Sequence, residues 1–370
     1  MKKTVLCVAG ILALLISGCS AGSAKSEEKT LKGVFAKHGM KIGTCVTSAM
    51  IGKENTSEIM LSQFNSLTME NAMKPENTLN MIKSQEAGKP VVEFNREALS
   101  ILEWAKENNF AMRGHTLIWY SQTPDWIFRE GFTVSGGFVG RDEMLSRMEA
   151  FISGTFEKLK ELGFLDLFYA FDVVNEAWME DGSMRKNHWS EIIGDDYLWY
   201  AFYYADKYAP ESIDLYYNDY NEQYKTDALL KFVETLKDEN GKYLIDGIGF
   251  QAHLYTSDSL KGYFYAVDKL AETGLKIQLT ELDIGLGKYM DPLPAEDDNL
   301  KKQGQFCYDL INGLFERVDS GKLKMDALTF WGFCDSLSWR KEYSPLLYTK
   351  DLTPKYAYYG AMQVKDKAGY

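Results

Sequence analysis

The stretch FDVVNEAW, residues Phe171–Trp178, is the part of this sequence that decides the fold. Its first half is rich in aromatic and β-branched residues, which favours a strand buried on both faces, as in a parallel sheet. The apolar run stops at the polar pair Asn175-Glu176. In a parallel α/β barrel the catalytic groups lie at the carboxyl ends of the strands, so Glu176 is predicted to lie in such a site.

A second stretch of the same kind, LKIQLTELD over Leu275–Asp283, places Glu281 after another apolar run. Two acids are the minimum needed to cleave a glycosidic bond by double displacement, with carboxyl groups about 5–5.5 Å apart. Taken alone, each Glu could equally be a solvated strand-end residue or an ion-pair partner. Two of them in equivalent positions favour a catalytic pair.

Strands alternate with helices along most of the chain, which is typical of an α/β fold with a parallel sheet. Besides the strand that leads into Glu176, the predicted strands are Lys41–Val46, Phe64–Met69, Phe110–Gly114, Ile213–Tyr217, Ile248–Phe250, Lys276–Leu279 and Ala327–Phe330. The predicted helices include Ala98–Asn108, Arg141–Leu162, Thr226–Leu236, Leu260–Ala271 and Leu300–Val318. Eight such units predict a single (β/α)8 barrel over residues 31–370. An open doubly wound sheet is the alternative, but no glycine-rich dinucleotide fingerprint follows any predicted strand.

The composition places the chain among globular proteins, since 45% of its 370 residues are hydrophobic and 25% are charged. A formal net charge of -12 disfavours polyanionic partners, so we expect no nucleic acid. The four His residues lack the close spacing of a zinc site, and neither a Gly-x-Ser-x-Gly motif nor a phosphate-binding loop is present. We therefore expect no metal, no cofactor and a monomeric chain.

The N-terminus predicts export. A basic start is followed by the apolar segment Val5–Ile16, which is too short to span a membrane comfortably. The segment ends in Ser17-Gly18-Cys19, which resembles the lipobox of bacterial lipoproteins. The resemblance implies a signal peptide over residues 1–18, lipidation of Cys19 and a flexible tether over residues 19–30. We expect a lipoprotein anchored to a membrane at the cell envelope or cell surface; an ordinary signal peptide or an uncleaved anchor are the alternatives.

Three cysteines follow this leader: Cys45, Cys307 and Cys334. Three scattered thiols do not form a disulfide framework. Cys45 and Cys334 lie near the ends of the first and last predicted strands, which are neighbours in a closed barrel, so a bridge between them stays open. Free, buried thiols are the favoured interpretation.

Polar side chains recur at the ends of the predicted strands. They are Glu70, Asn71, His115, Asn175, Glu176, Asn218, Gln251, His253, Glu281, Asp283 and Trp331. In a barrel these ends converge on one mouth. Gln251 and His253 are two residues apart, as are Glu281 and Asp283, so each pair is expected to share one strand face. Because buried polar groups need hydrogen-bond partners, a hydroxyl-rich ligand explains the ring best.

Five motifs recur at or near the ends of predicted strands: TMENAMK (Thr68–Lys74), GHTLIWYSQTPDW (Gly114–Trp126), FDVVNEAW (Phe171–Trp178), LTELDI (Leu279–Ile284) and TFWGFCDSLSW (Thr329–Trp339). Together they resemble glycoside hydrolase family 10, the endo-β-1,4-xylanases, and the likeness runs from about Lys41 to Tyr359. The resemblance implies a (β/α)8 barrel, xylan and xylo-oligosaccharides as substrates, and a retaining mechanism. Glu176 would be the general acid/base and Glu281 the nucleophile.

The same resemblance implies roles for residues beside the two acids. Asn175 would hydrogen-bond the 2-hydroxyl of the sugar at the point of cleavage, and Gln251 would join the substrate-binding set. His253 and Asp283 would orient Glu281, and His253 would also contact substrate. The alternative for His253, taken alone, is a core histidine bonded to a backbone carbonyl.

Further positions match residues that line the family's binding cleft. The glycone-side polar contacts would be Glu70, Asn71, Lys74, His115 and Gln122, and the rings along the sugar chain would be Trp119, Tyr220, Trp331 and Trp339. The last two would wall the pocket beside C5 of xylose, and Asn221 would help to bind the leaving-group side. As alternatives, Glu70 and Lys74 form a plain i,i+4 ion pair, and any single Trp is a core residue.

Three other functions stay open. The first is a β-1,4-glucanase on the same barrel, which shares every element of the predicted chemistry except the sugar. The second is a surface glycan-binding protein that keeps the cleft without cleaving, although the presence of both glutamates argues against it. The third is a purely structural lipoprotein, which does not need polar residues at every strand end.

Overall fold

The computed structural model of the chain describes residues 30–370. The first of these, Thr30, is the N-cap of helix α2 (Leu31–Ala36): its Oγ1 accepts a hydrogen bond of 3.2 Å from the backbone N–H of Gly33. The expected signal peptide, the lipidated Cys19 and the tether up to residue 29 lie outside the described residues.

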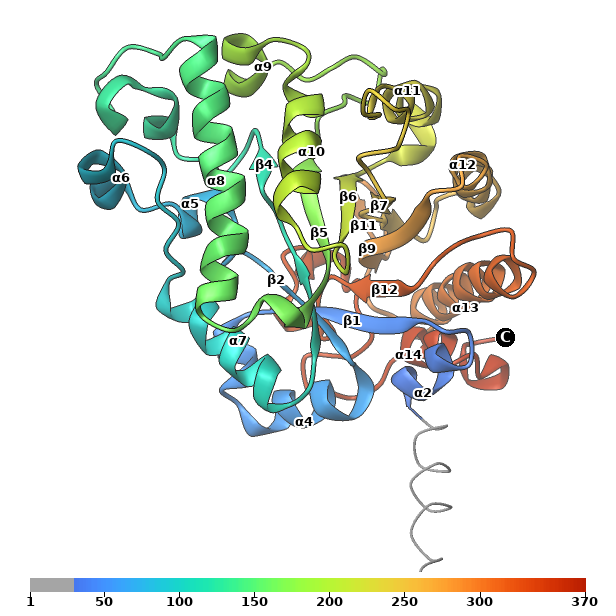
Figure 1. Cartoon of the computed structure of the whole chain (residues 1–370). Helices are drawn as coiled ribbons and strands as arrows, with labels where there is room; N and C mark the ends of the chain where they lie inside the picture. Colours follow the sequence, from blue (N-terminus) through green and yellow to red (C-terminus); the bar gives the residue numbers. More distant parts are fainter. Residues whose placement is uncertain (1–29) are drawn as a thin grey trace, which may run out of the picture.

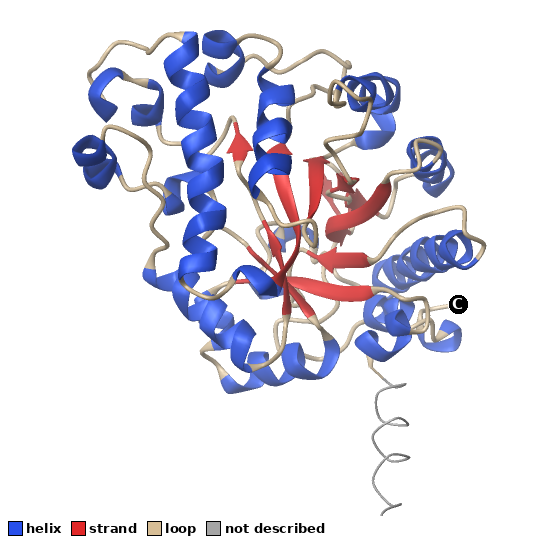
Figure 2. Ribbon diagram, in the orientation of Figure 1, coloured by secondary structure: helices blue, strands red, loops and turns tan. Residues whose placement is uncertain are grey.

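Eight parallel strands close into a barrel (Figures 1 and 2). They are β1 (Lys41–Val46), β2 (Ser66–Met69), β3 (Ala111–Gly114), β5 (Phe168–Asn175), β6 (Asp214–Asp219), β7 (Gly247–Phe250), β9 (Lys276–Gly285) and β12 (Ala327–Phe330). Strand β12 pairs with both β9 and β1, with Lys41 opposite Ala327, so the sheet closes on itself. Figure 1 shows the closure as blue β1 beside orange β12. Two short strands, β4 (Ile118–Trp119) and β8 (His253–Tyr255), pair with β5 and β9.

Helices surround the strands (Figure 2). The longer ones are α4 (Glu54–Gln63), α7 (Arg96–Glu107), α8 (Arg141–Glu161), α10 (Tyr197–Tyr208), α11 (Glu222–Thr235), α12 (Leu260–Ala271) and α13 (Asp297–Asp319). The shorter ones are α3 (Ser48–Ile51), α5 (Pro75–Thr78), α6 (Met81–Ala87), α9 (His188–Ile193) and α14 (Tyr356–Ala361). A small hairpin of β10 (Gly287–Lys288) and β11 (Asp291–Pro292) follows β9.

Helix α7 shows why these segments adopt their structure. Ala98, Ile101, Leu102 and Ala105 are buried, and their spacing of three and four residues places them on one helix face. The side chain of Asn95 accepts a hydrogen bond of 2.9 Å from the N–H of Ala98 and so starts the helix. Every residue of β7 and β12 is buried instead, because one face meets the barrel interior and the other meets the helices.

The single (β/α)8 barrel predicted from the sequence is confirmed, and β1, β12 and α12 have the predicted bounds. Strand β9 differs, since it runs past the predicted end at Leu279 to Gly285. The extension is paired with β8, where His253 lies opposite Asp283. Helix α11 also begins earlier than predicted, at Glu222, and its first turn is bent at Lys225.

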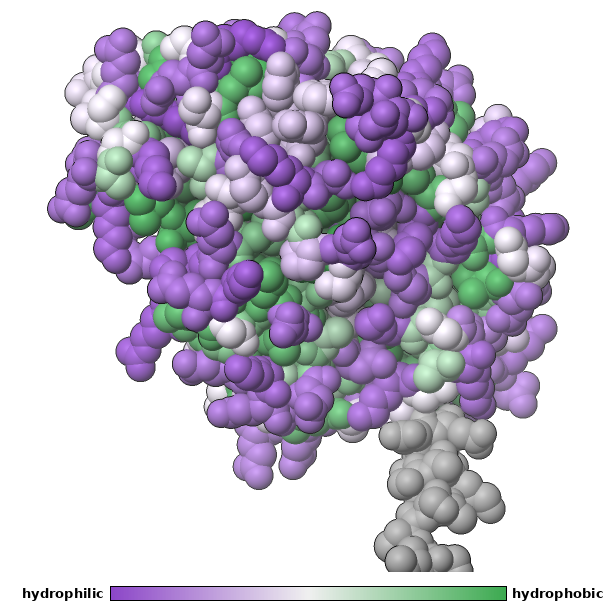
Figure 3. Space-filling view, in the orientation of Figure 1, coloured by the Kyte–Doolittle hydropathy of each residue, from purple (hydrophilic) through white to green (hydrophobic). Residues whose placement is uncertain are grey.

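The three cysteines after the leader, Cys45, Cys307 and Cys334, are buried and free, so the prediction of free thiols is confirmed and a Cys45–Cys334 bridge is excluded. The outer face seen in Figure 3 is mostly hydrophilic, with small scattered apolar patches. None of the helices within residues 30–370 is both long enough and apolar enough to cross a bilayer.

Candidate active site

The two residues that follow the apolar part of β5 both reach the barrel mouth. A register shift lies between Asp172 and Val174, where β5 pairs with β6, and Glu176 adopts a left-handed backbone with φ 55°. In a regular strand Asn175 and Glu176 would point to opposite faces. The shift and the left-handed residue turn the chain so that both side chains join one hydrogen-bond network.

This network of side-chain amides connects the two predicted catalytic acids. Gln251 Nε2 donates to Glu176 Oε1 at 2.9 Å and to Asn175 Oδ1 at 3.3 Å. Asn218 Nδ2 donates to the same Asn175 oxygen at 2.9 Å and to Glu281 Oε1 at 2.8 Å. The two carboxyl groups therefore lie at the same mouth, joined through three amide side chains.

Glu281 is held as a carboxylate. It is only 5% exposed, and burial by itself raises the pKa of a carboxyl group. Hydrogen bonds from His253 and Asn218, with the electrostatic effect of the two neighbouring imidazoles, outweigh burial and lower the pKa of Glu281 to about 2. An ionised carboxylate is the form that a nucleophile requires.

His253 lies between two carboxylates. Its Nε2 is 3.3 Å from Glu281 Oε2, and its Nδ1 is 3.1 Å from Asp283 Oδ2. Burial by itself lowers the pKa of His253. The negative charges of Asp283 and Glu281 have the larger and opposite effect and raise this pKa to about 9, so the ring is cationic at pH 7. Asp283 also pairs with Arg340 and accepts a hydrogen bond of 3.2 Å from Trp339 Nε1. His253 thus belongs to the site and is not an isolated core histidine.

Glu176 has neutral hydrogen-bond donors around its carboxyl group. Trp119 Nε1 donates to Oε2 at 3.1 Å, and Gln251 donates to Oε1. Glu176 is partly exposed, whereas Glu281 is buried and contacts a cationic ring. Two carboxyl groups of the same chemical type therefore have opposite surroundings, as an acid and a nucleophile need.

Lys74 is the centre of the predicted glycone-side group. Its Nζ donates to Asn71 Oδ1 and to Gln122 Oε1, both at 2.9 Å, and lies 5.0 Å from the centroid of the Trp119 ring. These hydrogen bonds go to two amides, so the plain Glu70–Lys74 ion pair is not how this lysine is held. Glu70 is partly buried, and burial raises its pKa although Lys74 opposes the shift.

His115 lies close to Glu281 in the barrel interior. It is 2% exposed, its Nδ1 is 2.8 Å from Asp172 Oδ2, and the same nitrogen is 4.0 Å from Glu281 Oε1. Asp172 also forms a fully buried ion pair with Arg113. The sequence-based site lacked Asp172 and Arg113; the available signal was a charged residue inside each of two apolar strands.

The predicted aromatic positions differ in exposure. Trp331 is 6% exposed and packs edge-on against His115, with 5.4 Å between the ring centroids. Trp339 is 57% exposed and lies edge-on against His253 at 5.1 Å. Trp119 is partly buried beside Glu176. Trp339 therefore presents the largest free ring surface of these three.

On the predicted leaving-group side, Tyr220 and Asn221 follow β6. The Tyr220 hydroxyl accepts a hydrogen bond of 2.8 Å from Arg185 Nη2, and Arg185 Nε donates to the Glu176 carbonyl at 3.0 Å. Asn221 has a left-handed backbone with φ 53°, and its Nδ2 donates to Glu180 Oε1 at 2.6 Å. Sequence analysis missed Arg185, because no strand end or motif marks its loop.

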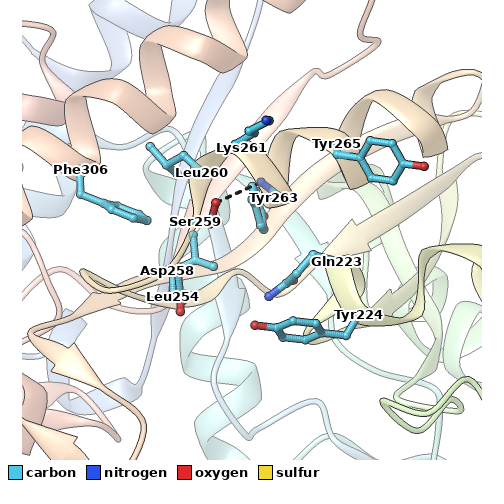
Figure 4. A pocket seen from close by; sticks show the side chains of 11 residues that line it. Gln223, Tyr224, Leu254, Asp258, Ser259, Leu260, Lys261, Tyr263, Tyr265 and Phe306 are labelled. Atoms are coloured by element: carbon cyan, nitrogen blue, oxygen red, sulfur yellow. Dashed lines mark hydrogen bonds between the residues drawn. The ribbon is translucent and has the colours of Figure 1, made fainter.

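A pocket of about 480 Å³ lies elsewhere, around the first turn of α12 (Figure 4). Its lining includes Tyr224, Leu254 and Phe306 and shares no residue with the network around the two acids.

Within residues 30–370, no group of three or more His, Cys, Asp or Glu side chains is placed to hold a metal ion.

Known proteins resemble this chain over most of its length. The bifunctional endo-1,4-beta-xylanase XylA of Ruminococcus flavefaciens is 38% identical over 92% of this chain and 34% of its own length. An endo-1,4-beta-xylanase of Geobacillus stearothermophilus is 32% identical over 92% of this chain and 99% of its own length. The chain spans 34%, 32% and 51% of the first three curated relatives, so it corresponds to a part of those larger proteins.

Solved structures show the same fold. The CBM22-1–GH10 modules of endo-1,4-beta-D-xylanase 10B from Clostridium thermocellum, complexed with xylohexaose, superpose with a TM-score of 0.81 at 30% identity, covering 93% of this chain and 69% of that one. Xylanase XynB from Paenibacillus barcinonensis gives a TM-score of 0.78 at 29% identity, covering 90% and 98%. Residues 30–364 match the model of glycosyl hydrolase family 10. Because this match covers nearly the whole described chain, and the chain forms the closed barrel described above, the protein belongs to glycosyl hydrolase family 10.

Proposed function

We propose that the protein is a retaining endo-β-1,4-xylanase that hydrolyses internal xylosidic bonds of xylan and xylo-oligosaccharides. The observation that carries the proposal is the pair Glu281 and Glu176, which share one mouth but have opposite surroundings. Membership of the family supports the reaction class, and relatives named as endo-1,4-beta-xylanases support the substrate.

In the first step a Glu281 oxygen attacks C1 of the sugar, and Glu176 gives its proton to the glycosidic oxygen, which leaves as a hydroxyl. A covalent glycosyl ester on Glu281 results. While Glu281 is an anion, its charge favours the protonated form of Glu176. Esterification removes that charge, and Glu176 then takes a proton from the water that attacks C1, which releases the sugar with retained configuration.

We assign to Asn175 the recognition of the sugar at the point of cleavage. Its Oδ1 accepts hydrogen bonds from Asn218 and Gln251, which leaves its Nδ2 as the group that donates to the 2-hydroxyl. A hydrogen bond to this hydroxyl strengthens as the oxocarbenium ion develops. The Lys74 group and the rings of Trp119, Tyr220, Trp331 and Trp339 would bind the remaining hydroxyls and sugar faces, with Glu70, Asn71, His115, Gln122 and Asn221.

Initial rates on soluble xylan and on carboxymethylcellulose test the proposal. We expect reducing sugar to appear faster from xylan. Faster cleavage of the cellulose derivative would instead make the protein a glucanase on the same barrel. No reducing sugar from either polymer, together with retained binding, would make it a glycan-binding protein.

We also propose that the protein is exported and anchored to a membrane through lipidated Cys19. The support is the sequence alone: the basic start, the apolar segment Val5–Ile16 and the Gly18-Cys19 step.

A further inference from the structure

We propose that Lys225, acting through Asp219 and Tyr217, is a positioning residue for the general acid/base; this inference rests on the role proposed above for Glu176. Lys225 lies in the first turn of α11, and its side chain is 0% exposed. Its Nζ donates to Asp219 Oδ1 and to the carbonyl oxygen of Trp178, both at 2.8 Å. Trp178 is two residues after Glu176, so the ammonium group directly holds the loop that carries the acid.

The partner Asp219 extends this hold to both neighbouring loops. It is 0% exposed and accepts a hydrogen bond from the Tyr217 hydroxyl, which in turn accepts one of 3.0 Å from the N–H of Ala177. Asp219 Oδ1 also accepts a hydrogen bond of 2.9 Å from the N–H of Tyr220. One buried group therefore holds the backbone after β5 and the backbone after β6.

Glu176 needs this support because its own backbone is left-handed, with φ 55°. Such a conformation is unfavourable in a non-glycine residue and persists only where the surroundings impose it. The donors on its carboxyl group, Gln251 and Trp119, fix the end of the side chain. The hydrogen bonds made by the N–H of Ala177 and by the carbonyl oxygen of Trp178 hold the backbone from which the Glu176 side chain starts. They thereby set the direction from which the proton reaches the leaving oxygen.

A general stabilising role explains the ion pair less well. Burying an ammonium and a carboxylate carries a large desolvation cost, and well-packed apolar residues often replace such pairs without loss of stability. Burial raises the pKa of Asp219 to about 6 even though Lys225 opposes the shift. Lys225 is therefore needed to keep Asp219 an acceptor for both loops. Its Nζ also lies 4.4 Å from the centroid of the Tyr220 ring, and because its side chain is 0% exposed it cannot itself touch substrate.

The test compares leaving groups, because misplacing an acid harms only reactions that need its proton. In Lys225→Met we expect kcat/KM on xylan to fall about 10- to 100-fold, part of the roughly 10²–10⁴-fold that general acid catalysis supplies. The rate of the first step with 2,4-dinitrophenyl β-xylobioside, whose leaving group needs no proton, should change less than about 2-fold. Glu176→Ala provides the reference pattern, with a larger loss on xylan and the same sparing of the dinitrophenyl substrate.

Lys355→Met is the matched control. Lys355 is also buried, and it also donates to one aspartate, Asp335, and to one backbone carbonyl, that of Ser344. Removing it should change both substrates by the same factor. If Lys225→Met fails to fold, Tyr217→Phe serves instead. It removes only the hydroxyl oxygen that connects the N–H of Ala177 with Asp219, and we expect the same selective loss of activity on xylan.

Equal loss on the two substrates in Lys225→Met or Tyr217→Phe, or no loss on either, overturns the inference. The wild-type protein separates this outcome from failure of the proposed function. If the wild type cleaves neither xylan nor the dinitrophenyl substrate, the proposed function is wrong, whereas an active wild type with unselective variants removes only the role of Lys225.

Discussion

Glu281 and Glu176 acquire their different behaviour from neighbours that differ in charge. A cationic His253 lies 3.3 Å from Glu281, and the pKa of that carboxyl group is about 2. Glu176 receives hydrogen bonds from an indole and an amide. A positive charge next to a carboxyl group stabilises its ionised form, and this is the state in which the structure holds Glu281.

Glu281→Ala should abolish turnover on xylan, since no carboxylate is left to attack C1. Added azide should partly restore the rate and yield a glycosyl azide of inverted configuration, because the small anion enters the space that the side chain leaves. Product configuration by NMR checks this expectation. Recovery with retained configuration would mean that Glu281 is not the nucleophile.

His253 should stabilise the fold in a pH-dependent way. Its folded pKa of about 9 lies above its unfolded value, so its contribution is complete below the unfolded pKa of about 6.5 and is lost as pH rises through 9. The free energy of unfolding lost in His253→Gln should therefore be largest near pH 6, on the order of 2 kcal/mol, and smaller at pH 10. Urea unfolding at both pH values measures it.

The control for this measurement is His188→Gln, whose side chain is 41% exposed and should matter little at either pH. The contribution of Glu281 to the free energy of unfolding changes with pH in the opposite direction, because its folded pKa of about 2 lies below the unfolded value of about 4.3. Its contribution is present above that unfolded value and is lost as pH falls toward 2. A His253→Gln loss that does not change between pH 6 and pH 10 would contradict the ion pair.

At the scale of the elements, left-handed backbone conformations after the strand ends orient the side chains of the site. Glu176, Asn221 and Ala252 follow β5, β6 and β7, and their φ angles are 55°, 53° and 58°. Each left-handed residue turns the chain where a strand stops, so that side chains near the turn face the mouth. Gln251 and His253 reach different acids on either side of Ala252, which a simple alternation rule does not describe.

Gly249→Ala should impair both stability and catalysis. A Cβ at Gly249 would collide with the Oδ1 of Asn218, whose amide group donates to Asn175 and Glu281. Overpacking in a tight core costs about 1–3 kcal/mol, and displacing Asn218 should also lower kcat. Gly247→Ala collides instead with the ring of Tyr216 and serves as the control. The same ratio of activity loss to stability loss in both variants would refute a special role for Gly249.

At the scale of the whole molecule, one barrel carries the described site, and the sequence adds an expected anchor outside it. Cys19→Ser removes the thiol that would carry the lipid. The full-length protein should therefore move from the detergent phase to the aqueous phase in a Triton X-114 partition, because stable anchoring needs two acyl chains. Its kcat on soluble xylan should not change, because Cys19 precedes the described domain. Equal partitioning of Cys19→Ser and wild type would rule out lipidation at this residue.

The sequence predicted the barrel because the signals for its strands and helices are local, whereas most of the candidate site residues came from the resemblance to the family. Strands β1 and β12 and helix α12 were predicted to the residue, since burial on both faces and helical spacing appear within a few residues. The extension of β9 to Gly285 was missed, because it depends on pairing with β8. Arg185 and Lys225 were missed because they bond backbone atoms of other loops, and no short-range pattern records such contacts.

By itself, then, the sequence determined the order of strands and helices and the two glutamates that end apolar runs, because these follow from local hydrophobic patterns. Only the tertiary structure decided that the histidine beside Glu281 is cationic, how Gln251 reaches Glu176 75 residues away, and which buried charges hold the loops. The physical reason is that the charge state of a carboxyl group depends on atoms within a few ångströms, and closure of the barrel alone brings those atoms together.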